Sequence, residues 1–272
     1  MVFVVGCMNA SIQEFPAHSR EASSPAPFDM VVQGLTKNFS TIERAIDNIS
    51  FEVTRGQAVA LIGSDSSGKS TLLRCCAGLM SPDAGSVRIF DKELCTLSVK
   101  ERQKVLLDVG FLNGGLEHTS EQKVEEVILA GAKPRLSSIS FFVQKLFNGR
   151  LKKQVKELLS EYNLEPIKDK LLRELSPFEH KLVLLASLRM QGIKVLLADD
   201  PVSGLDVANA EKFMAILLQT VRGQGMTLIF TSRELIDALA YADRAIALLQ
   251  GRLELDAPVG AEDARVLRTL AG

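Results

Sequence analysis

The chain has 272 residues, and its 32 Lys and Arg residues nearly balance its 33 Asp and Glu residues, for a formal charge of −1. This length allows a large buried core, and the balanced charge gives no sign of a nucleic-acid-binding surface. No apolar run approaches the roughly 20 residues that a membrane-spanning helix needs, and the four cysteines show no spacing typical of a disulfide framework or metal site. We therefore expect a cytoplasmic globular protein that does not bind nucleic acid.

Strand-like and helix-like segments alternate along the chain from residue 30 onward. Before them, residues 1–28 end in a Ser-, Pro- and Ala-rich stretch, which is typical of a flexible tail, and we expect a second tail at 256–272. Between the tails, we expect strands at 31–35, 49–53, 58–62, 86–90, 109–112, 195–198, 227–231 and 245–249. We expect helices at 69–79, 121–130, 178–190, 208–222 and 234–241. The alternation predicts one α/β domain, residues 29–255, with a largely parallel sheet.

The block at about 114–180 interrupts this alternation, because it contains no strand pattern. Its apolar residues recur at helical spacing, and they are Leu151, Val155, Leu158, Leu159 and Tyr162. We interpret the block as a helical subdomain. Four basic residues lie close together in it (Arg150, Lys152, Lys153 and Lys156), and a solvated helix face explains them better than a surface for lipid or a partner.

A phosphate-binding loop is predicted at 63–71, where GSDSSGKST fits the pattern G-x-x-x-x-G-K-[ST] between a strand and a helix. Backbone N–H groups and the helix dipole together make such a loop an anion site. In it, Lys69 is expected to reach the β- and γ-phosphates and Ser70 to ligate Mg²⁺. We expect nucleotide contacts from Gly63, Ser64, Asp65, Ser66, Ser67, Gly68, Lys69, Ser70 and Thr71, with Ser66 standing where many such loops carry glycine.

A second acidic site is predicted within KVLLADDPVSGLD, residues 194–206. Asp199 ends an apolar strand, where a carboxylate needs a cation, and Mg²⁺ held jointly with Ser70 meets that need. Asp200 is one residue further, placed to polarise an attacking water. The alternative is a turn or helix-cap pair before Pro201.

Several spaced segments together resemble the ATP-binding subunit of ABC transporters, loosely the phosphonate-importer type. They are GLTKNF, IDNISFEVTRGQAVALIG, GSDSSGKSTLLRCCAGLMSPDAGSV, LSPFE, VLLADDPVSGLD and YADRAIALLQGRL. The resemblance implies a P-loop NTPase fold with a mostly parallel core sheet, an antiparallel β portion and a helical subdomain that meets a permease. It implies ATP and Mg²⁺ as ligands and gives Phe39 the role of stacking on adenine, although a place in the core is nearly as good an interpretation. The segment 203–206 is similar to the family's D-loop, which lies across a dimer interface.

The signature loop departs from the family, in which LSGGQ caps the γ-phosphate of ATP held by the opposite subunit. Here it reads LSPFE. Ser176 remains to make that contact, but Pro177 has no N–H to donate, Phe178 adds bulk, and Glu179 adds a negative charge. We expect a weaker contact with the nucleotide of the partner subunit.

Three further departures concern hydrolysis. Gly114, with Asn113 beside it, takes the place of a glutamine that senses Mg²⁺ and water. Asp200 replaces a glutamate and is one methylene shorter, and Ser232 replaces a histidine that supplies charge near the γ-phosphate. The groups that bind Mg-ATP are retained, while those that complete hydrolysis are weakened.

We therefore expect an ATP-binding subunit of an ABC transporter that works as a dimer beneath permease subunits on the inner face of a membrane. Its ATP hydrolysis, with Asp200, Lys69 and Ser232 as catalytic residues, is expected to be slow. The alternative is a non-hydrolysing or regulatory subunit that pairs with an intact ATPase in a heterodimer rather than a homodimer. A soluble ABC protein of DNA repair or translation fits less well, because the chain has a single cassette and no long coiled-coil insertion.

Overall fold

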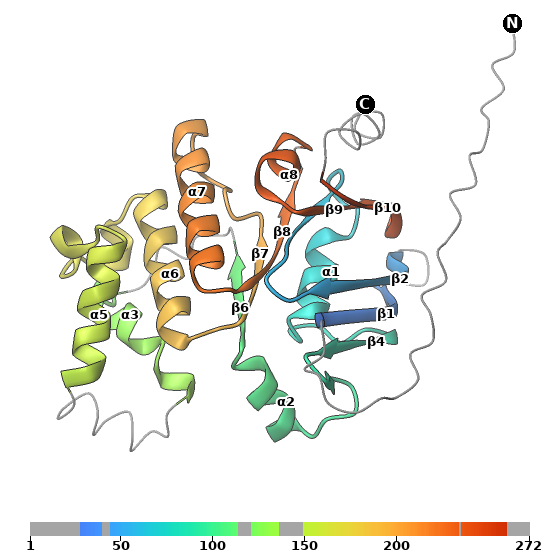
Figure 1. Ribbon diagram of the computed structural model, residues 1–272, viewed down its shortest axis with the longest axis horizontal. Coiled ribbons are helices and arrows are strands. Elements are labelled where there is room, and N and C mark those ends of the chain that lie inside the picture. The colour runs from blue at the N-terminus through green and yellow to red at the C-terminus, as the bar shows by residue number, and fades with distance from the viewer. Residues whose placement is uncertain (1–27, 40–43, 114–120, 136–148, 234, 260–272) are drawn as a thin grey trace, which may run out of the picture.

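The computed structural model describes residues 28–39, 44–113, 121–135, 149–233 and 235–259 (Figure 1). The expected N-terminal tail thus lies outside the described residues, apart from Phe28, which begins the first strand. Most of the expected C-terminal tail also lies outside them. Residues 256–258, however, belong to a strand, so the expected boundary at 255 is three residues short.

Two sheets form the β structure, and both were expected. A four-stranded antiparallel sheet has the order β2-β1-β4-β5, made of β2 (Arg44–Thr54), β1 (Phe28–Asn38), β4 (Ala84–Ile89) and β5 (Lys92–Glu93). A six-stranded sheet has the order β10-β9-β3-β8-β7-β6, made of β10 (Arg252–Pro258), β9 (Arg244–Leu249), β3 (Ala58–Ile62), β8 (Thr227–Ser232), β7 (Val195–Asp199) and β6 (Val109–Asn113). All its neighbouring pairs are parallel except β10 with β9. The α/β class with a mostly parallel core sheet and an antiparallel portion is confirmed.

The central strands separate two hydrophobic clusters. All five residues of β3 are buried, as are all five of β7. Side chains alternate between the faces of a strand, so Ala58, Ala60 and Ile62 join one cluster while Val59 and Leu61 join the other. This burial on both faces explains why β3 and β7 are continuous apolar runs in the sequence.

Helices cover the core sheet and build the subdomain drawn at the left of Figure 1. They are α1 (Lys69–Cys76), α2 (Val99–Leu106), α3 (Val124–Ala130), α5 (Gly149–Glu161), α6 (Pro177–Gln191), α7 (Val207–Gly223) and α8 (Leu235–Tyr241), with short 3₁₀ turns at Lys133–Arg135, Glu165–Ile167 and Leu172–Glu174. The described part of 114–180 is helical as expected, with one isolated β-bridge between Lys123 and Leu171. Of the described helices, none is both long and apolar enough to cross a bilayer.

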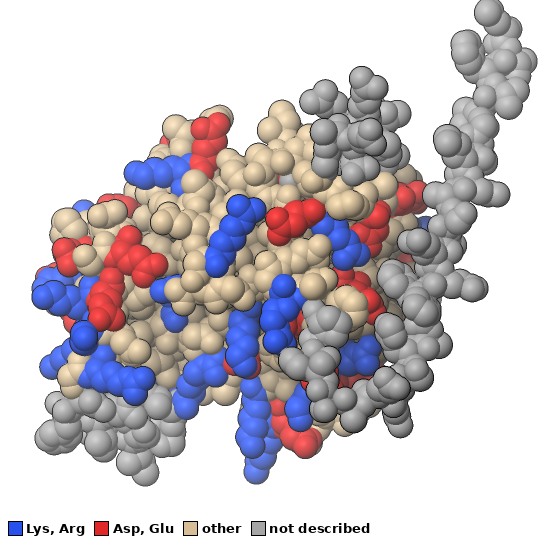
Figure 2. Space-filling view, in the orientation of Figure 1, with Lys and Arg blue, Asp and Glu red and all other residues tan. Residues whose placement is uncertain are grey.

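Helix α5 confirms the interpretation of the helical spacing. Its residues Leu151, Val155, Leu158 and Leu159 are buried, while its basic residues are exposed. The Lys153 ammonium pairs with the Glu157 carboxylate at 3.8 Å, and acidic and basic side chains are interspersed on this side of the molecule (Figure 2). A solvated helix face accounts for these charges.

The sequence analysis missed α2, β5 and β10, and it placed some boundaries wrongly. Helix α1 ends at Cys76 rather than at residue 79 because the chain turns at Gly78, where φ is +67°. Strand β10 lies at the edge of the sheet, where its residues alternate between exposed and half-buried positions and none is fully buried, so it lacks the continuous apolar run of the central strands. The sequence does mark the start of helix α2, because Ser98 and Glu101 form a capping box there.

A buried carboxylate joins the two sheets. Asp29, in β1, is 2% exposed. Its Oδ2 accepts a 2.6 Å hydrogen bond from the Thr227 hydroxyl of β8, and its Oδ1 lies 3.0 Å from Arg55 Nε. Thr227 Oγ1 in turn accepts a 2.8 Å hydrogen bond from the Gly56 N–H. The network fixes the antiparallel sheet against the strand that borders β3.

Helix α6 starts with a complete capping box. The Ser176 Oγ accepts the Glu179 N–H at 3.3 Å, and the Glu179 carboxylate accepts the Ser176 N–H at 2.8 Å and the Ser176 hydroxyl at 2.7 Å. Pro177 occupies the first helical position, where no N–H is needed. The helix therefore begins at Pro177, one residue earlier than expected.

Substituting Asp29→Ala should lower the free energy of unfolding by roughly 1.5–3 kcal/mol, because Thr227 and Arg55 lose a charged hydrogen-bond partner. Urea unfolding measures this change. As a control, Asp83→Ala removes the exposed partner of Lys37 and should cost less. Equal losses for the two variants would show that Asp29 does not link the sheets.

Substituting Glu179→Gln should lower the free energy of unfolding by roughly 0.3–1.5 kcal/mol at neutral pH. Burial raises the pKa of Glu179, but the hydrogen bonds from Ser176 outweigh it, so the folded-state pKa lies below its ordinary value. The carboxylate thus contributes stability that is complete above the unfolded-state pKa of about 4.3 and is lost as the pH falls through the lower folded-state pKa. The difference between wild type and variant, measured by urea unfolding at several pH values, should shrink in that acidic window, and a difference that does not vary with pH would contradict the assignment.

Candidate nucleotide-binding site

The loop between β3 and α1 has the backbone of a phosphate cradle. Gly68 has φ +100°, and a Cβ there would lie 2.3 Å from the Ala45 carbonyl oxygen. Gly63 has φ +151°, and a Cβ there would lie 2.4 Å from the Leu248 carbonyl oxygen. Only glycine fits at either position. Ser66 has φ +66°, which explains why glycine is common at this place and shows that serine is accommodated.

Lys69 lies at the centre of the loop and is 9% exposed. Its ammonium donates hydrogen bonds to the Gly63 carbonyl at 2.7 Å, the Ser64 carbonyl at 2.8 Å and the Ser67 hydroxyl at 3.3 Å. Burial lowers the pKa of Lys69 below its ordinary value, an effect that the nearby Asp65 carboxylate partly offsets. The loop thus holds a partly desolvated positive charge that a phosphate oxygen can bind.

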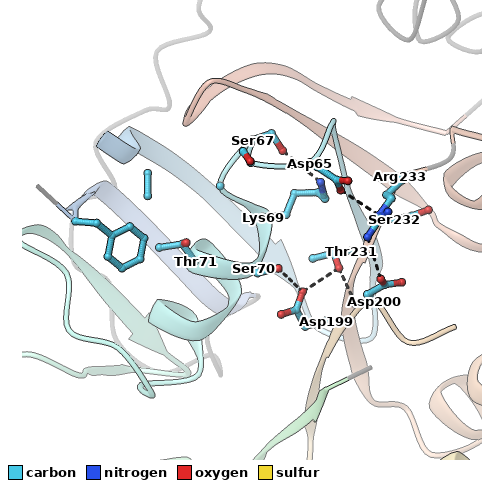
Figure 3. Close-up of a pocket in the computed structure, with 14 residues that line it drawn as sticks. Asp65, Ser67, Lys69, Ser70, Thr71, Asp199, Asp200, Thr231, Ser232 and Arg233 are labelled. Atoms are coloured by element: carbon cyan, nitrogen blue, oxygen red, sulfur yellow. Dashed lines mark hydrogen bonds and ion pairs between the residues drawn. The ribbon is translucent and has the colours of Figure 1, made fainter. Parts of the chain in front are cut away.

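Ser70 and Asp199 meet beside this lysine, as Figure 3 shows. The Ser70 hydroxyl donates to Asp199 Oδ1 at 2.7 Å, and the Thr231 hydroxyl donates to the same oxygen at 3.2 Å. Asp199 is 4% exposed, and its other oxygen lies 3.8 Å from Arg74 Nη2. Helix α1 and strands β7 and β8 therefore bring a carboxylate and two hydroxyls to one point.

These donors fit Mg²⁺. The ion prefers oxygen ligands and usually takes few from the protein, keeping water and substrate phosphates for the rest. Among the described residues, no three His, Cys, Asp or Glu side chains gather into a metal cluster. Two protein oxygens beside a phosphate loop are what a nucleotide-bound Mg²⁺ requires, whereas a metal without nucleotide would find too few ligands.

Asp200 lies at the rim of the same cleft in an unusual conformation. Its φ is +51°, a region that Asp tolerates better than most residues, and its N–H donates to Thr231 Oγ1 at 2.8 Å. The carboxylate oxygen Oδ2 lies 3.8 Å from Arg233 Nη2. The charge of Asp200 also acts on Lys181, which is 1% exposed. Burial lowers the pKa of this lysine, and the Asp200 carboxylate partly offsets that effect.

Ser232 ends β8 and is 8% exposed. Its hydroxyl donates to Asp237 Oδ2 in α8 at 2.7 Å. The side chain lines the cleft, but its hydroxyl proton is directed toward a carboxylate.

Phe39 lines the same cleft and is 56% exposed. The alternative place in the core is therefore wrong for this residue, because more than half of its surface is exposed to solvent. A large exposed aromatic side chain beside a polar cleft can stack on a planar ligand.

One cleft of about 280 Å³ collects most of the predicted site residues. It is lined by Phe39, Ala45, Asp65, Ser66, Ser67, Gly68, Lys69, Ser70, Thr71, Asp199, Asp200, Thr231, Ser232 and Arg233. Gly63 and Ser64 are not among the lining residues, but their carbonyl groups accept hydrogen bonds from the Lys69 ammonium. The sequence analysis missed Thr231 and Arg233, although both flank the predicted position Ser232.

Ser176 does not line this cleft. It lies with Phe178, Glu179 and the segment 204–206 along a separate groove of about 490 Å³. The Glu179 carboxylate, expected to repel a polyphosphate, is engaged by the N–H and hydroxyl of Ser176. Gly114 lies outside the described residues, and Asn113 ends β6 directly opposite Asp199 in the register of the sheet.

Known proteins with similar sequences cover most of the chain. The chain is 31% identical over 229 residues to "Phosphonates import ATP-binding protein PhnC 2" of Haloarcula marismortui, covering 84% of each chain. It is 32% identical over 243 residues to "Phosphonates import ATP-binding protein PhnC 1" of Nostoc sp., covering 89% of this chain and 91% of the relative.

Solved structures share the fold at lower identity. The cbiO1 structure from Clostridium perfringens, described as part of the ABC transporter complex cbiONQ, aligns with a TM-score of 0.76 at 24% identity over 90% of this chain and 94% of that one. The ATP-binding cassette MJ0796, described as dimeric and bound to ADP and Pi, aligns with a TM-score of 0.72 at 23% identity over 85% of this chain and 99% of that one. The family profile described as "ABC transporter" matches residues 46–203, more than half of the chain. The chain belongs to the ABC transporter family.

Proposed function

We propose that this chain is the ATP-binding subunit of an ABC transporter and that it binds Mg-ATP in the cleft around Lys69. The observation that carries the proposal is the 2.7 Å contact between Ser70 and Asp199 beside the buried Lys69 ammonium. A hydroxyl from the phosphate loop and a carboxylate from a neighbouring strand together form the usual protein half of a nucleotide-bound Mg²⁺ site. The names of the two relatives support an importer.

Different residues of the cleft bind different parts of the nucleotide. The N–H groups of the loop and the start of α1 receive phosphate oxygens, Lys69 contributes charge to the β- and γ-phosphates, and Phe39 stacks on adenine. Ser70 and Asp199 would hold Mg²⁺, which would supply positive charge beside the phosphates. In hydrolysis, water attacks the γ-phosphorus, the bond to the β-phosphate oxygen breaks, and Asp200 accepts the proton of the water.

Two contacts support slow hydrolysis. The Ser232 hydroxyl donates to Asp237 and carries no positive charge. The Ser176 hydroxyl is shared with Glu179, which leaves it less able to donate to a phosphate of a partner subunit.

The chain is proposed to work as a dimer beneath permease subunits and so to lie peripherally on the inner face of the membrane. Two ATP molecules between the subunits would close the dimer and drive the permease. The cap at Ser176 and Glu179 also favours a second candidate, a regulatory subunit paired with an intact ATPase. Co-purification with a related ATPase would support this heterodimer, and a stable, active homodimer would contradict it.

Substituting Asp200→Glu should raise the single-turnover rate of ATP hydrolysis by roughly tenfold, part of the 10²–10⁴ that a positioned base contributes. The longer side chain reaches further into the cleft. Quench-flow with radiolabelled ATP measures the rate, and Asp200→Asn is the control that should bind ATP but lose the residual turnover. A wild-type rate of about 1–100 s⁻¹, typical of kinases, would refute slow hydrolysis.

Chelating Mg²⁺ should weaken ATP binding to the wild type, whereas Ser70→Ala and Asp199→Asn should bind ATP weakly whether or not Mg²⁺ is present. The reason is that these two residues supply the protein oxygens at the metal. Calorimetric titration with and without EDTA measures the effect. Ser70→Thr keeps the hydroxyl and should keep the Mg²⁺ dependence; a dependence that survives in Ser70→Ala and Asp199→Asn would place the metal elsewhere.

A further inference from the structure

Arg233 stands directly after β8 at the mouth of the cleft, with its guanidinium between two carboxylates (Figure 3). Its Nε lies 3.1 Å from Asp65 Oδ1 in the phosphate loop, and its Nη2 lies 3.8 Å from Asp200 Oδ2 after β7. One arginine thus joins both sides of the cleft. Its side chain is 63% exposed, so solvent surrounds it and it can change partners without unpacking the core.

The cleft is lined by two cations, Lys69 and Arg233, and by the three carboxylates of Asp65, Asp199 and Asp200. Of the two cations, Lys69 is buried and Arg233 is exposed. The charge of Arg233 acts on Lys69 as well, since it helps to lower the pKa of that lysine, after burial as the main cause. Two cations therefore face the volume where the β- and γ-phosphates are expected.

Ser232 supplies no positive charge to the cleft. Its side chain is neutral, and its hydroxyl donates a hydrogen bond to Asp237 in α8. The next residue along the chain is the one that turns its positive charge into the cleft. A guanidinium suits phosphate well, because its planar fork of N–H groups can donate two parallel hydrogen bonds.

We propose that Arg233 binds the γ-phosphate of ATP, exchanging its contacts with Asp65 and Asp200 for phosphate oxygens. The inference rests on the proposed function, because it assumes ATP in the cleft. Two effects follow from this exchange of partners by Arg233. The protein distinguishes ATP from ADP through Arg233, and Asp200 is released from its cation when ATP is bound.

A simpler role for Arg233 would be to neutralise Asp65, a carboxylate in a loop built for anions. The two roles differ in what they predict. Neutralisation acts on any phosphate in the loop, so it would affect ATP and ADP alike and would become unnecessary once Asp65 lost its charge. A γ-phosphate contact acts on ATP alone and is needed whether or not Asp65 is charged.

The test compares the affinities of Mg-ATP and Mg-ADP by fluorescence titration in the wild type, Arg233→Ala and the double variant Asp65→Asn/Arg233→Ala. We expect Arg233→Ala to weaken ATP binding by roughly tenfold or more, the loss of a charge-assisted hydrogen bond, and to leave ADP binding within about twofold. The double variant should not regain selectivity for ATP. The matched control is Arg222→Ala, which removes an equally exposed arginine of α7 (62% against 63%) paired with Asp243, and it should change neither affinity.

Equal losses for ATP and ADP, or full recovery in the double variant, would overturn the inference and leave nucleotide binding intact. An unchanged ATP affinity in Arg233→Ala would also overturn it. Because ADP binding reports whether each variant is folded, a failure to fold cannot imitate the expected result. A wild type that binds neither nucleotide would instead overturn the proposed function, and the inference with it.

Discussion

The hydrogen bond between Ser70 and Asp199 depends on the order of three strands. Ser70 follows β3 and Asp199 ends β7, and the two strands are separated in the sheet by β8 alone. Because β3, β8 and β7 are mutually parallel, their carboxyl ends reach the same edge, where the loop after β3 turns across β8 toward β7. Thr231 of β8 fills the space between them, donating to Asp199 and accepting from the N–H of Asp200. Ligand sites of open α/β sheets lie at this edge for the same reason.

The residues proposed to hold the nucleotide and those proposed to act in its cleavage differ in how firmly the fold supports them. Lys69, Ser70 and Asp199 are held by buried strands, by two glycines that no other residue could replace, and by short hydrogen bonds. Asp200 and Arg233 lie at the rim, more exposed and paired at 3.8 Å. On the proposed assignment, the phosphate loop and the Mg²⁺ ligands therefore belong to the rigid part of the site, while Arg233 and Asp200 must change partners when ATP binds.

The altered signature loop has a structural explanation. Serine, then proline, then glutamate at the third helical position is a strong start for a helix, and in α6 each of these groups is used in that way. The residues that we propose to weaken a contact with a partner's phosphate thus also fix the start of α6. On this proposal, stability of the helix start and catalysis at a shared site place opposite demands on the same residues.

Local pattern predicted the phosphate loop and the end of β7, because both are short runs in which glycine, lysine or aspartate follows an apolar strand. It could not decide where Phe39 lies, since an aromatic residue suits a core as well as a ligand. Nor could it find the pairing of Arg233 with Asp65, because residues so distant in sequence meet only through the parallel register of β3 and β8. The positive φ of Asp200 was likewise hidden, as it follows from the turn after β7 rather than from the residue itself.

The central claim is that the cleft holds Mg-ATP well and cleaves it slowly. The most direct test is to incubate the protein with Mg-ATP, remove free nucleotide rapidly, and identify the bound nucleotide over time. The account predicts that ATP predominates long after an enzyme working at about 1–100 s⁻¹ would have converted it. Bound ADP at the first time point, or no retained nucleotide at all, would contradict it.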